Sequence, residues 1–150
     1  MTIQRLLDGE AIRALVGAYA EAADRGRSEE LAALFAPDGV LEIIGDSFDA
    51  GVHAGRAAIV ARLEATRRDL AARAPLRLLR HHVSSVRIEL DGDTGRGASY
   101  FLALTESGPD HWGRYADDYV RVDEGWRFTR RRVVHEGRAA GSWLERATSG

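Results

Sequence analysis

The sequence predicts an α+β fold in which three N-terminal helices pack on a strongly curved, mostly antiparallel sheet that encloses a pocket. Two observations carry this prediction. Apolar residues recur at helical spacing as far as Arg73, and from Leu76 onward they alternate with a period of two. Helices and strands segregated in this way are typical of α+β domains. No repeat or linker divides the 150 residues, so we expect one domain spanning residues 1–150.

The first helix is predicted by an apolar stripe that precedes Gly26. Asp8 is the expected N-cap, because an aspartate side chain can accept a backbone hydrogen bond at a helix start. Gly26 is the expected stop, since glycine readily takes the left-handed conformation that ends helices. The stripe consists of Ile12, Leu15, Val16, Tyr19 and Ala23.

A second, short helix should follow. Ser28 is its expected N-cap, and Glu29 and Glu30 favour the positive end of its dipole. Residues 37–39, with the sequence Pro-Asp-Gly, should end it as a turn. Its apolar face should comprise Leu31, Leu34 and Phe35.

The rest of the chain reads as one further helix and a set of strands. Residues 40–44 should form a short strand and residues 45–55 an irregular segment. A third helix is predicted over Arg56–Arg73, closed by Pro75. Four long strands with turns between them should follow, over Leu76–Leu90, Ala98–Thr105, Trp112–Val122 and Trp126–His135, and the tail 141–150 should carry one helical turn.

The composition excludes several classes of function. A formal net charge of -2 gives no general attraction for nucleic acid or for anionic membranes. The chain has no cysteine, so disulfides, thiolate metal sites and cysteine nucleophiles are excluded. Acidic residues and arginines interrupt the first residues where a signal peptide would be apolar. We therefore expect a cytoplasmic protein.

His81 is the leading candidate for chemistry. Strand alternation places it on the apolar face with Leu79 and Val83, and it directs His82 to the other face. Further along, the apolar phase shifts to Val86 and Ile88, which predicts a β-bulge near Ser84 and Ser85. The pattern alone leaves two interpretations open: a functional histidine, or a core histidine bound to a backbone carbonyl.

Asp24 and Tyr19 lie near the end of the first helix. A carboxylate in the last turn opposes the helix dipole, which can mark a functional residue. From local sequence alone, a surface aspartate paired with Arg25 or Arg27 is the favoured interpretation. Tyr19 lies one turn earlier on the apolar stripe, where a tyrosine is more often part of the core than a catalytic donor.

Ligand contacts are expected from three further side chains, Tyr115, Arg132 and Phe35. In the run of arginines at 130–132, alternate side chains should point to opposite faces, and one or two of them could reach the pocket mouth or meet Asp117 or Asp118. Solvated or ion-paired arginine is the favoured interpretation of this run. No metal-ligand spacing, phosphate loop, GxSxG or dinucleotide motif is present, so we expect no metal and no cofactor.

Several segments resemble the SnoaL-like branch of the nuclear transport factor 2-like superfamily. They are residues 19–26 (YAEAADRG), 31–39 (LAALFAPDG), 51–56 (GVHAGR), 80–85 (RHHVSS), 113–115 (GRY) and 125–128 (GWRF). Each is weak alone, but their order and spacing cover nearly the whole chain. The sequence departs from the pattern at Ser85, where many relatives have asparagine.

The resemblance implies a function for the two candidate residues. The branch includes enzymes similar to scytalone dehydratase, hexachlorocyclohexane dehydrochlorinase and bile-acid 7α-dehydratase, in which a strand histidine and a helix-end aspartate form a dyad. His81 and Asp24 match those positions, and Tyr19 matches a tyrosine five residues before the aspartate. The resemblance therefore implies cofactor-independent elimination or isomerisation of a small hydrophobic compound, in a homodimer or homotrimer. The same superfamily also holds non-catalytic binding modules and dioxygenase small subunits, and these remain alternatives.

Overall fold

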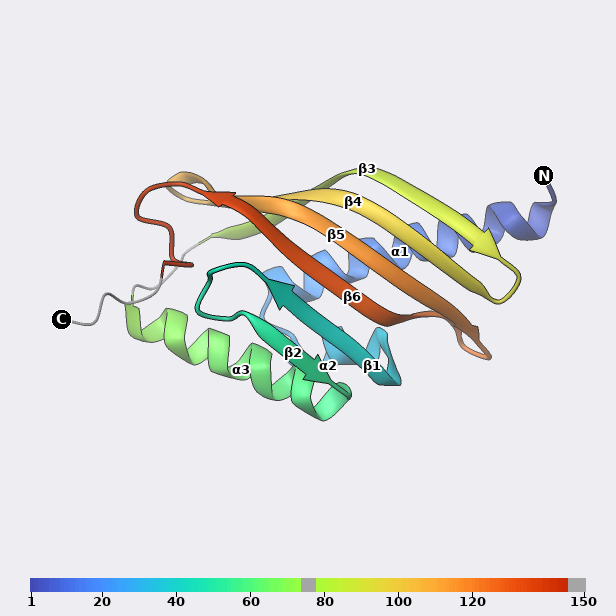
Figure 1. Cartoon of the computed structure of the whole chain (residues 1–150), viewed down its shortest axis with the longest axis horizontal. Coiled ribbons are helices and arrows are strands. Elements are labelled where there is room, and N and C mark those ends of the chain that lie inside the picture. Colours follow the sequence, from blue (N-terminus) through green and yellow to red (C-terminus); the bar gives the residue numbers. More distant parts are fainter. Residues whose placement is uncertain (74–77, 146–150) are drawn as a thin grey trace.

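The fold consists of three helices and one curved six-stranded sheet, in a computed structural model that describes residues 1–73 and 78–145. The helices are α1 (Ile3–Asp24), α2 (Ser28–Ala33) and α3 (Arg56–Arg73). Figure 1 shows α1 crossing behind the long strands and α3 running beside the short edge strands. The predicted α+β class is confirmed. Pro75, Leu76 and the end of the tail predicted to be helical lie outside the described residues.

The sheet has the strand order β2-β1-β6-β5-β4-β3. Neighbouring strands are antiparallel except β1 and β6, which are parallel. Four long strands in chain order, β3 to β6, make the predicted meander, and the shorter β1 and β2 extend it at one edge (Figure 1). The strands are β1 (Phe35–Ile44), β2 (Gly51–Ala54), β3 (Leu79–Asp91), β4 (Thr94–Thr105), β5 (Gly108–Val122) and β6 (Gly125–Arg138).

Three predicted loops are in fact strand. The segment 45–55 contains β2, residues 37–39 lie within β1 instead of ending a helix, and β5 already begins at Gly108. β4 also starts earlier than expected, at Thr94, although its first residues are rich in glycine. A Cβ on Gly97 would lie 2.7 Å from the Tyr119 hydroxyl oxygen, so this glycine makes room for a neighbouring strand's side chain.

The helix starts also differ from the prediction. α1 begins at Ile3, with Thr2 as the N-cap accepting from the Arg5 backbone N–H at 3.2 Å, so Asp8 lies inside the helix and not at its cap. Ser28 is the first residue of α2 and not its N-cap. The N-cap of α2 is Arg27, whose side chain makes no capping hydrogen bond. The predicted stop is confirmed, because α1 ends at Asp24 and Gly26 takes a φ of +65°.

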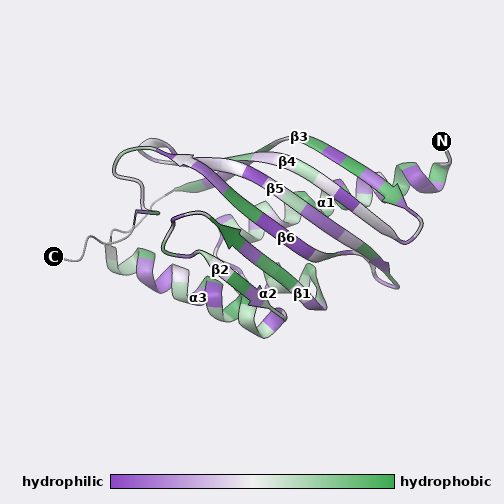
Figure 2. Ribbon diagram, in the orientation of Figure 1, coloured by the Kyte–Doolittle hydropathy of each residue, from purple (hydrophilic) through white to green (hydrophobic). Residues whose placement is uncertain are grey.

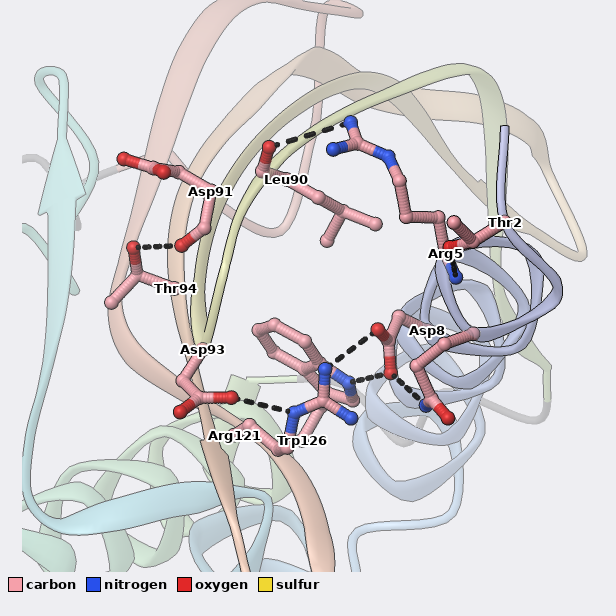
Figure 3. A network of polar contacts seen from close by, with 10 residues as sticks. Thr2, Arg5, Asp8, Leu90, Asp91, Asp93, Thr94, Arg121 and Trp126 are labelled. Atoms are coloured by element: carbon pink, nitrogen blue, oxygen red, sulfur yellow. Dashed lines mark hydrogen bonds and ion pairs between the residues drawn. The ribbon is translucent and has the colours of Figure 1, made fainter.

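Asp8 instead joins α1 to the β5–β6 hairpin (Figure 3). Its carboxylate accepts hydrogen bonds from the Arg121 guanidinium at 2.7 Å, the Trp126 indole N–H at 3.1 Å and the Gln4 amide at 3.1 Å. Burial acts to raise the pKa of Asp8, but these donors outweigh it and lower the pKa. Arg121 also binds Asp93 in the β3–β4 turn, so the network holds three parts of the chain together.

The core lies between α1 and the concave face of the sheet. It contains the predicted α1 stripe together with aromatic residues of the strands, among them Phe35, Tyr115 and Phe128. Figure 2 shows the strands alternating between hydrophobic and hydrophilic residues, as a sheet with only one covered face requires. None of the helices in the described part of the chain is long and apolar enough to cross a membrane.

Candidate active site

A cavity of about 530 Å³ opens between the C-terminal half of α1, helix α3 and the concave face of the sheet. This volume falls in the range of small-molecule sites. Its walls are largely apolar, with Leu41, Phe101, Val133 and Leu144 among the lining residues. Titratable side chains from α1, β3, β5 and β6 also face it, which makes it the candidate active site.

His81 and Asp24 meet at the wall of this cavity. The His81 ring Nδ1 lies 2.6 Å from Asp24 Oδ1, and the His81 backbone N–H donates to both carboxylate oxygens at 3.0 and 3.1 Å. The side chains are 14% and 10% exposed, respectively. A carboxylate beside Nδ1 favours the tautomer in which Nδ1–H is the donor, and in that tautomer the lone pair of Nε2 is available to a ligand.

The predicted β-bulge follows His81 in β3, and it contains Ser85. The β3–β4 register shifts between Ser84 and Arg87, as the change of apolar phase predicts, and His82 is exposed while His81 faces inward. Ser85 is exposed and has a φ of +54°, a left-handed conformation that asparagine adopts more readily than most residues. The difference from relatives at this position therefore concerns backbone conformation and not the cavity.

Tyr19 and Tyr115 line the cavity beside the dyad and rest on a buried cation. The Arg131 guanidinium carbon lies 4.2 Å from the Tyr19 ring centroid and 3.8 Å from that of Tyr115. Arg131 is 0% exposed and binds Asp117 through two hydrogen bonds of 2.8 and 2.9 Å. Burial raises the pKa of Tyr19 to about 12 even though Arg131 acts to lower it, so the phenol is protonated at neutral pH.

Two of the predicted ligand contacts lie elsewhere. Phe35 is fully buried in the core, where its ring lies 5.1 Å from that of Phe128, and it does not line the cavity. Arg132 points to the outer face of the sheet, with ion-pair contacts to Asp118 and Glu42 at 3.5 and 3.9 Å. A register shift in the β5–β6 pairing between Phe128 and Arg130 explains this, because it changes the phase of β6 so that Arg131, and not Arg132, points inward. The predicted meeting with Asp117 and Asp118 is confirmed, through Arg131 and Arg132 respectively.

A second histidine–aspartate pair, His111 and Asp110, also lies at the cavity and is not among the residues predicted from the sequence. His111 is 2% exposed, lines the cavity and contacts Asp110 at 2.8 Å through Nδ1. Asp110 Oδ2 also accepts from the Ser142 hydroxyl at 2.6 Å, which fixes the C-terminal segment over the cavity. Burial lowers the pKa of His111 to about 4. Extending the inward phase of Tyr115 back by four residues would have indicated His111.

His135 was also missed, although it shares the inward phase of Arg131 and Val133 on β6. Its ring lies 5.5 Å from the His111 ring, which in turn lies 6.0 Å from the His81 ring. Three histidines thus follow one another along the cavity wall. Across residues 1–73 and 78–145, no group of three or more histidine or carboxylate side chains is arranged to hold a metal ion.

Helices packed on a strongly curved sheet, with a largely apolar cavity between them that a few polar side chains face, define the class of nuclear transport factor 2-like domains. The chain belongs to the SnoaL-like domain family, whose model matches residues 4–132. This confirms the family resemblance and the fold that it implied.

Solved structures agree with this assignment. A candidate scytalone dehydratase from Novosphingobium aromaticivorans is 27% identical, with a TM-score of 0.78 over 98% of this chain and 95% of that one. A nuclear transport factor 2-like protein with a cystatin-like fold from the same organism is 26% identical, with a TM-score of 0.77 over 93% and 89%. The β subunit of a candidate aromatic-ring-hydroxylating dioxygenase from this organism, 18% identical with a TM-score of 0.71 over 95% and 97%, shares the fold. No curated protein matches the chain.

Proposed function

We propose that the protein is a cofactor-independent enzyme that transfers a proton at a carbon atom, as a lyase or isomerase, on a small hydrophobic compound. The observation that carries this proposal is the His81–Asp24 contact of 2.6 Å, made at the wall of a ligand-sized cavity. A carboxylate on Nδ1 leaves Nε2 as the basic nitrogen and stabilises the imidazolium once the proton has been taken up.

The chemistry follows from the positions of these groups. His81 Nε2 removes a proton from a carbon next to a carbonyl, and the electron pair of the broken C–H bond moves onto the carbonyl oxygen. A hydrogen bond from the Tyr19 hydroxyl stabilises that developing oxyanion. In an isomerisation the imidazolium returns the proton to another carbon. In an elimination the electron pair returns, the bond to a hydroxyl at the β-carbon breaks, and the imidazolium protonates the departing oxygen to give water.

Tyr19 is suited to this role because it remains a donor. Its raised pKa keeps the phenol protonated, while the Arg131 cation over its ring favours negative charge developing close to the hydroxyl. A substrate that fills the apolar cavity displaces water from it, which strengthens both interactions. The substrate class that fits is an alicyclic, aromatic, steroid-like or polyketide-like ketone, and the similarity to a candidate scytalone dehydratase supports this choice.

The test uses 1-tetralone, a bicyclic ketone with exchangeable hydrogens at C2. Loss of the C2–H signal in D2O, followed by NMR, measures proton abstraction without knowledge of the natural substrate. We expect wild-type protein to accelerate exchange, and His81→Ala and Asp24→Asn each to slow it by about 10²–10⁴-fold. The exposed neighbour His82→Ala is the matched control and should exchange at the wild-type rate.

Two results would contradict the proposal. Exchange within a few-fold of wild type in both dyad variants would remove the catalytic role of the dyad. Tight binding of ketones with no exchange by the wild type would favour a binding module instead, in which His81 and Asp24 only orient a polar group of the ligand.

A further inference from the structure

Buried polar atoms without a hydrogen-bond partner are concentrated beside the segment that joins β1 to β2. In the described part of the chain they include Ser47 Oγ and Asp49 Oδ1 of that segment, His53 Nε2 of β2, Arg62 Nε and Nη2 of α3, and both ring nitrogens of His135. Gly45, at the start of the segment, lies against the His135 side chain. Buried polar groups are nearly always partnered, so these atoms could complete their hydrogen bonds with polar groups of a ligand.

Two members of this cluster face the cavity from opposite sides of a short gap. His135 Nε2 and Asp49 Oδ1 are 4.0 Å apart, too far for a direct hydrogen bond, and both residues line the cavity. Their side chains are 12% and 11% exposed. One oxygen atom can lie about 2.8 Å from both of these atoms, and the angle at that oxygen is then about 90°. One hydroxyl can therefore donate to the carboxylate and accept from the ring at the same time.

We propose that His135 and Asp49 form a subsite for a hydroxyl group of the ligand. This inference rests on the proposed use of the cavity as a substrate site, and it adds that the substrate carries a second oxygen away from the reacting ketone. His111 separates His135 from His81 along the wall, so the hydroxyl is held at the far side of the skeleton from the dyad. The substrate class becomes a hydroxylated polycyclic or alicyclic ketone.

The charges around the subsite favour a hydroxyl over a carboxylate. Burial lowers the pKa of His135, and the nearby His81 and Arg138 lower it further while Asp49 and Asp46 act to raise it. The ring is therefore neutral near pH 7, able to donate from one nitrogen and accept at the other. A ligand carboxylate between this ring and Asp49 would be repelled by the Asp49 carboxylate. Arg62 also lines the cavity, and an anionic ligand would have to bind there.

The test compares 1-tetralone with its 5-, 6- and 7-hydroxy isomers and with a tetralone carboxylic acid, using isothermal titration calorimetry. We expect one hydroxy isomer to bind wild type at least about tenfold more tightly than 1-tetralone, since a hydrogen bond to a charged group contributes about 1.5–3 kcal/mol. Preference for a single isomer indicates a point contact and not general polarity. In His135→Phe and in Asp49→Leu the preference should fall to about twofold or less.

Three outcomes would overturn the subsite. In the first, all hydroxy isomers bind wild type within twofold of 1-tetralone. In the second, the preference for one isomer survives in His135→Phe. In the third, the carboxylic acid binds most tightly and loses this binding in Arg62→Met. Should His135→Phe fail to fold, the ¹⁵N shifts of the His135 ring on adding the preferred isomer replace it, and no shift counts against the subsite. His82→Phe is the matched control. His81→Phe should lose C2–H exchange but keep the hydroxyl preference, which separates failure of the proton-transfer proposal from failure of this one.

Discussion

Asp8 and Asp24 lie on the same helix, and both are withdrawn from solvent, yet their surroundings differ. Asp8 accepts from three side chains, Gln4, Arg121 and Trp126, so its oxygens are engaged with fixed donors. Asp24 has one histidine as its partner, bound through both backbone and ring, and it faces a cavity. The partners of Asp8 fix the fold, whereas the partner of Asp24 keeps a free nitrogen.

A similar contrast separates Asp117 in the core from the histidines of the cavity wall. Asp117 is satisfied by Arg131 and by the Tyr119 hydroxyl, deep under the aromatic residues. At the wall, His81 has a ring nitrogen to spare, and His135 has no partner on either nitrogen. The fully hydrogen-bonded Asp117 contributes specificity and stability, whereas His81 and His135 keep ring nitrogens at the cavity, where a ligand could bind them.

The largest effect is expected from breaking the Arg131–Asp117 ion pair in the core. Arg131→Met should lower the free energy of unfolding by about 3–5 kcal/mol, because it leaves the Asp117 carboxylate buried without its cation. Urea denaturation measures this change. The double variant Arg131→Met/Asp117→Asn should recover part of the loss, since a neutral amide costs less to bury than a lone carboxylate. A loss below 1 kcal/mol in the single variant would show that Asp117 finds another partner.

Much of the fold follows from the sequence because it depends on local periodicity. The change from helical to alternating spacing locates the helices and the meander, and the shift of phase after Val83 locates the bulge. The parallel pairing of β1 with β6 could not be predicted, since it joins segments about ninety residues apart without a local signal. The glycine at 97 could not be interpreted locally for a similar reason, because the space beside it is filled by Tyr119 of the next strand.

The residues of the candidate site also fall into those that a local pattern predicts and those that depend on distant partners. Alternation alone directs His81 inward, but the local sequence around Asp24 favours a surface ion pair, and only the family resemblance suggested a dyad. The structure shows why the local interpretation fails: Arg25 and Arg27 pair with Glu21 and Glu30 instead. Asp8 was misjudged as a cap because its partner Trp126 lies 118 positions away. A residue's role here depends on partners that only the folded chain brings near.

A smaller effect should distinguish the two aspartates directly. Asp8→Ala removes the acceptor shared by Arg121 and Trp126 and should lower Tm by about 5 °C. Asp24→Ala should lower Tm by about 2 °C or less, because the groups it frees lie at the cavity, where water can reach them. Thermal unfolding followed by circular dichroism measures both, and C2–H exchange of 1-tetralone should show the reverse order of loss. Equal Tm losses would remove the distinction between the two ends of α1.

The smallest expected effect is a difference in how the two regions respond to mild acid. His111 has a pKa of about 4 in the folded state against an ordinary value of 6.5, so the unfolded chain binds more protons below pH 6.5 and stability falls as pH drops. Between pH 7 and 5.5 this amounts to about 1 kcal/mol for His111. The lowered pKa of Asp8 acts in the same direction, but its contribution is lost only as pH falls below the ordinary aspartate value, well outside this pH interval. Urea midpoints at the two pH values should therefore differ less in His111→Gln than in wild type, whereas Asp8→Ala should keep the wild-type difference. An unchanged difference in His111→Gln would place the acid sensitivity outside the cavity wall.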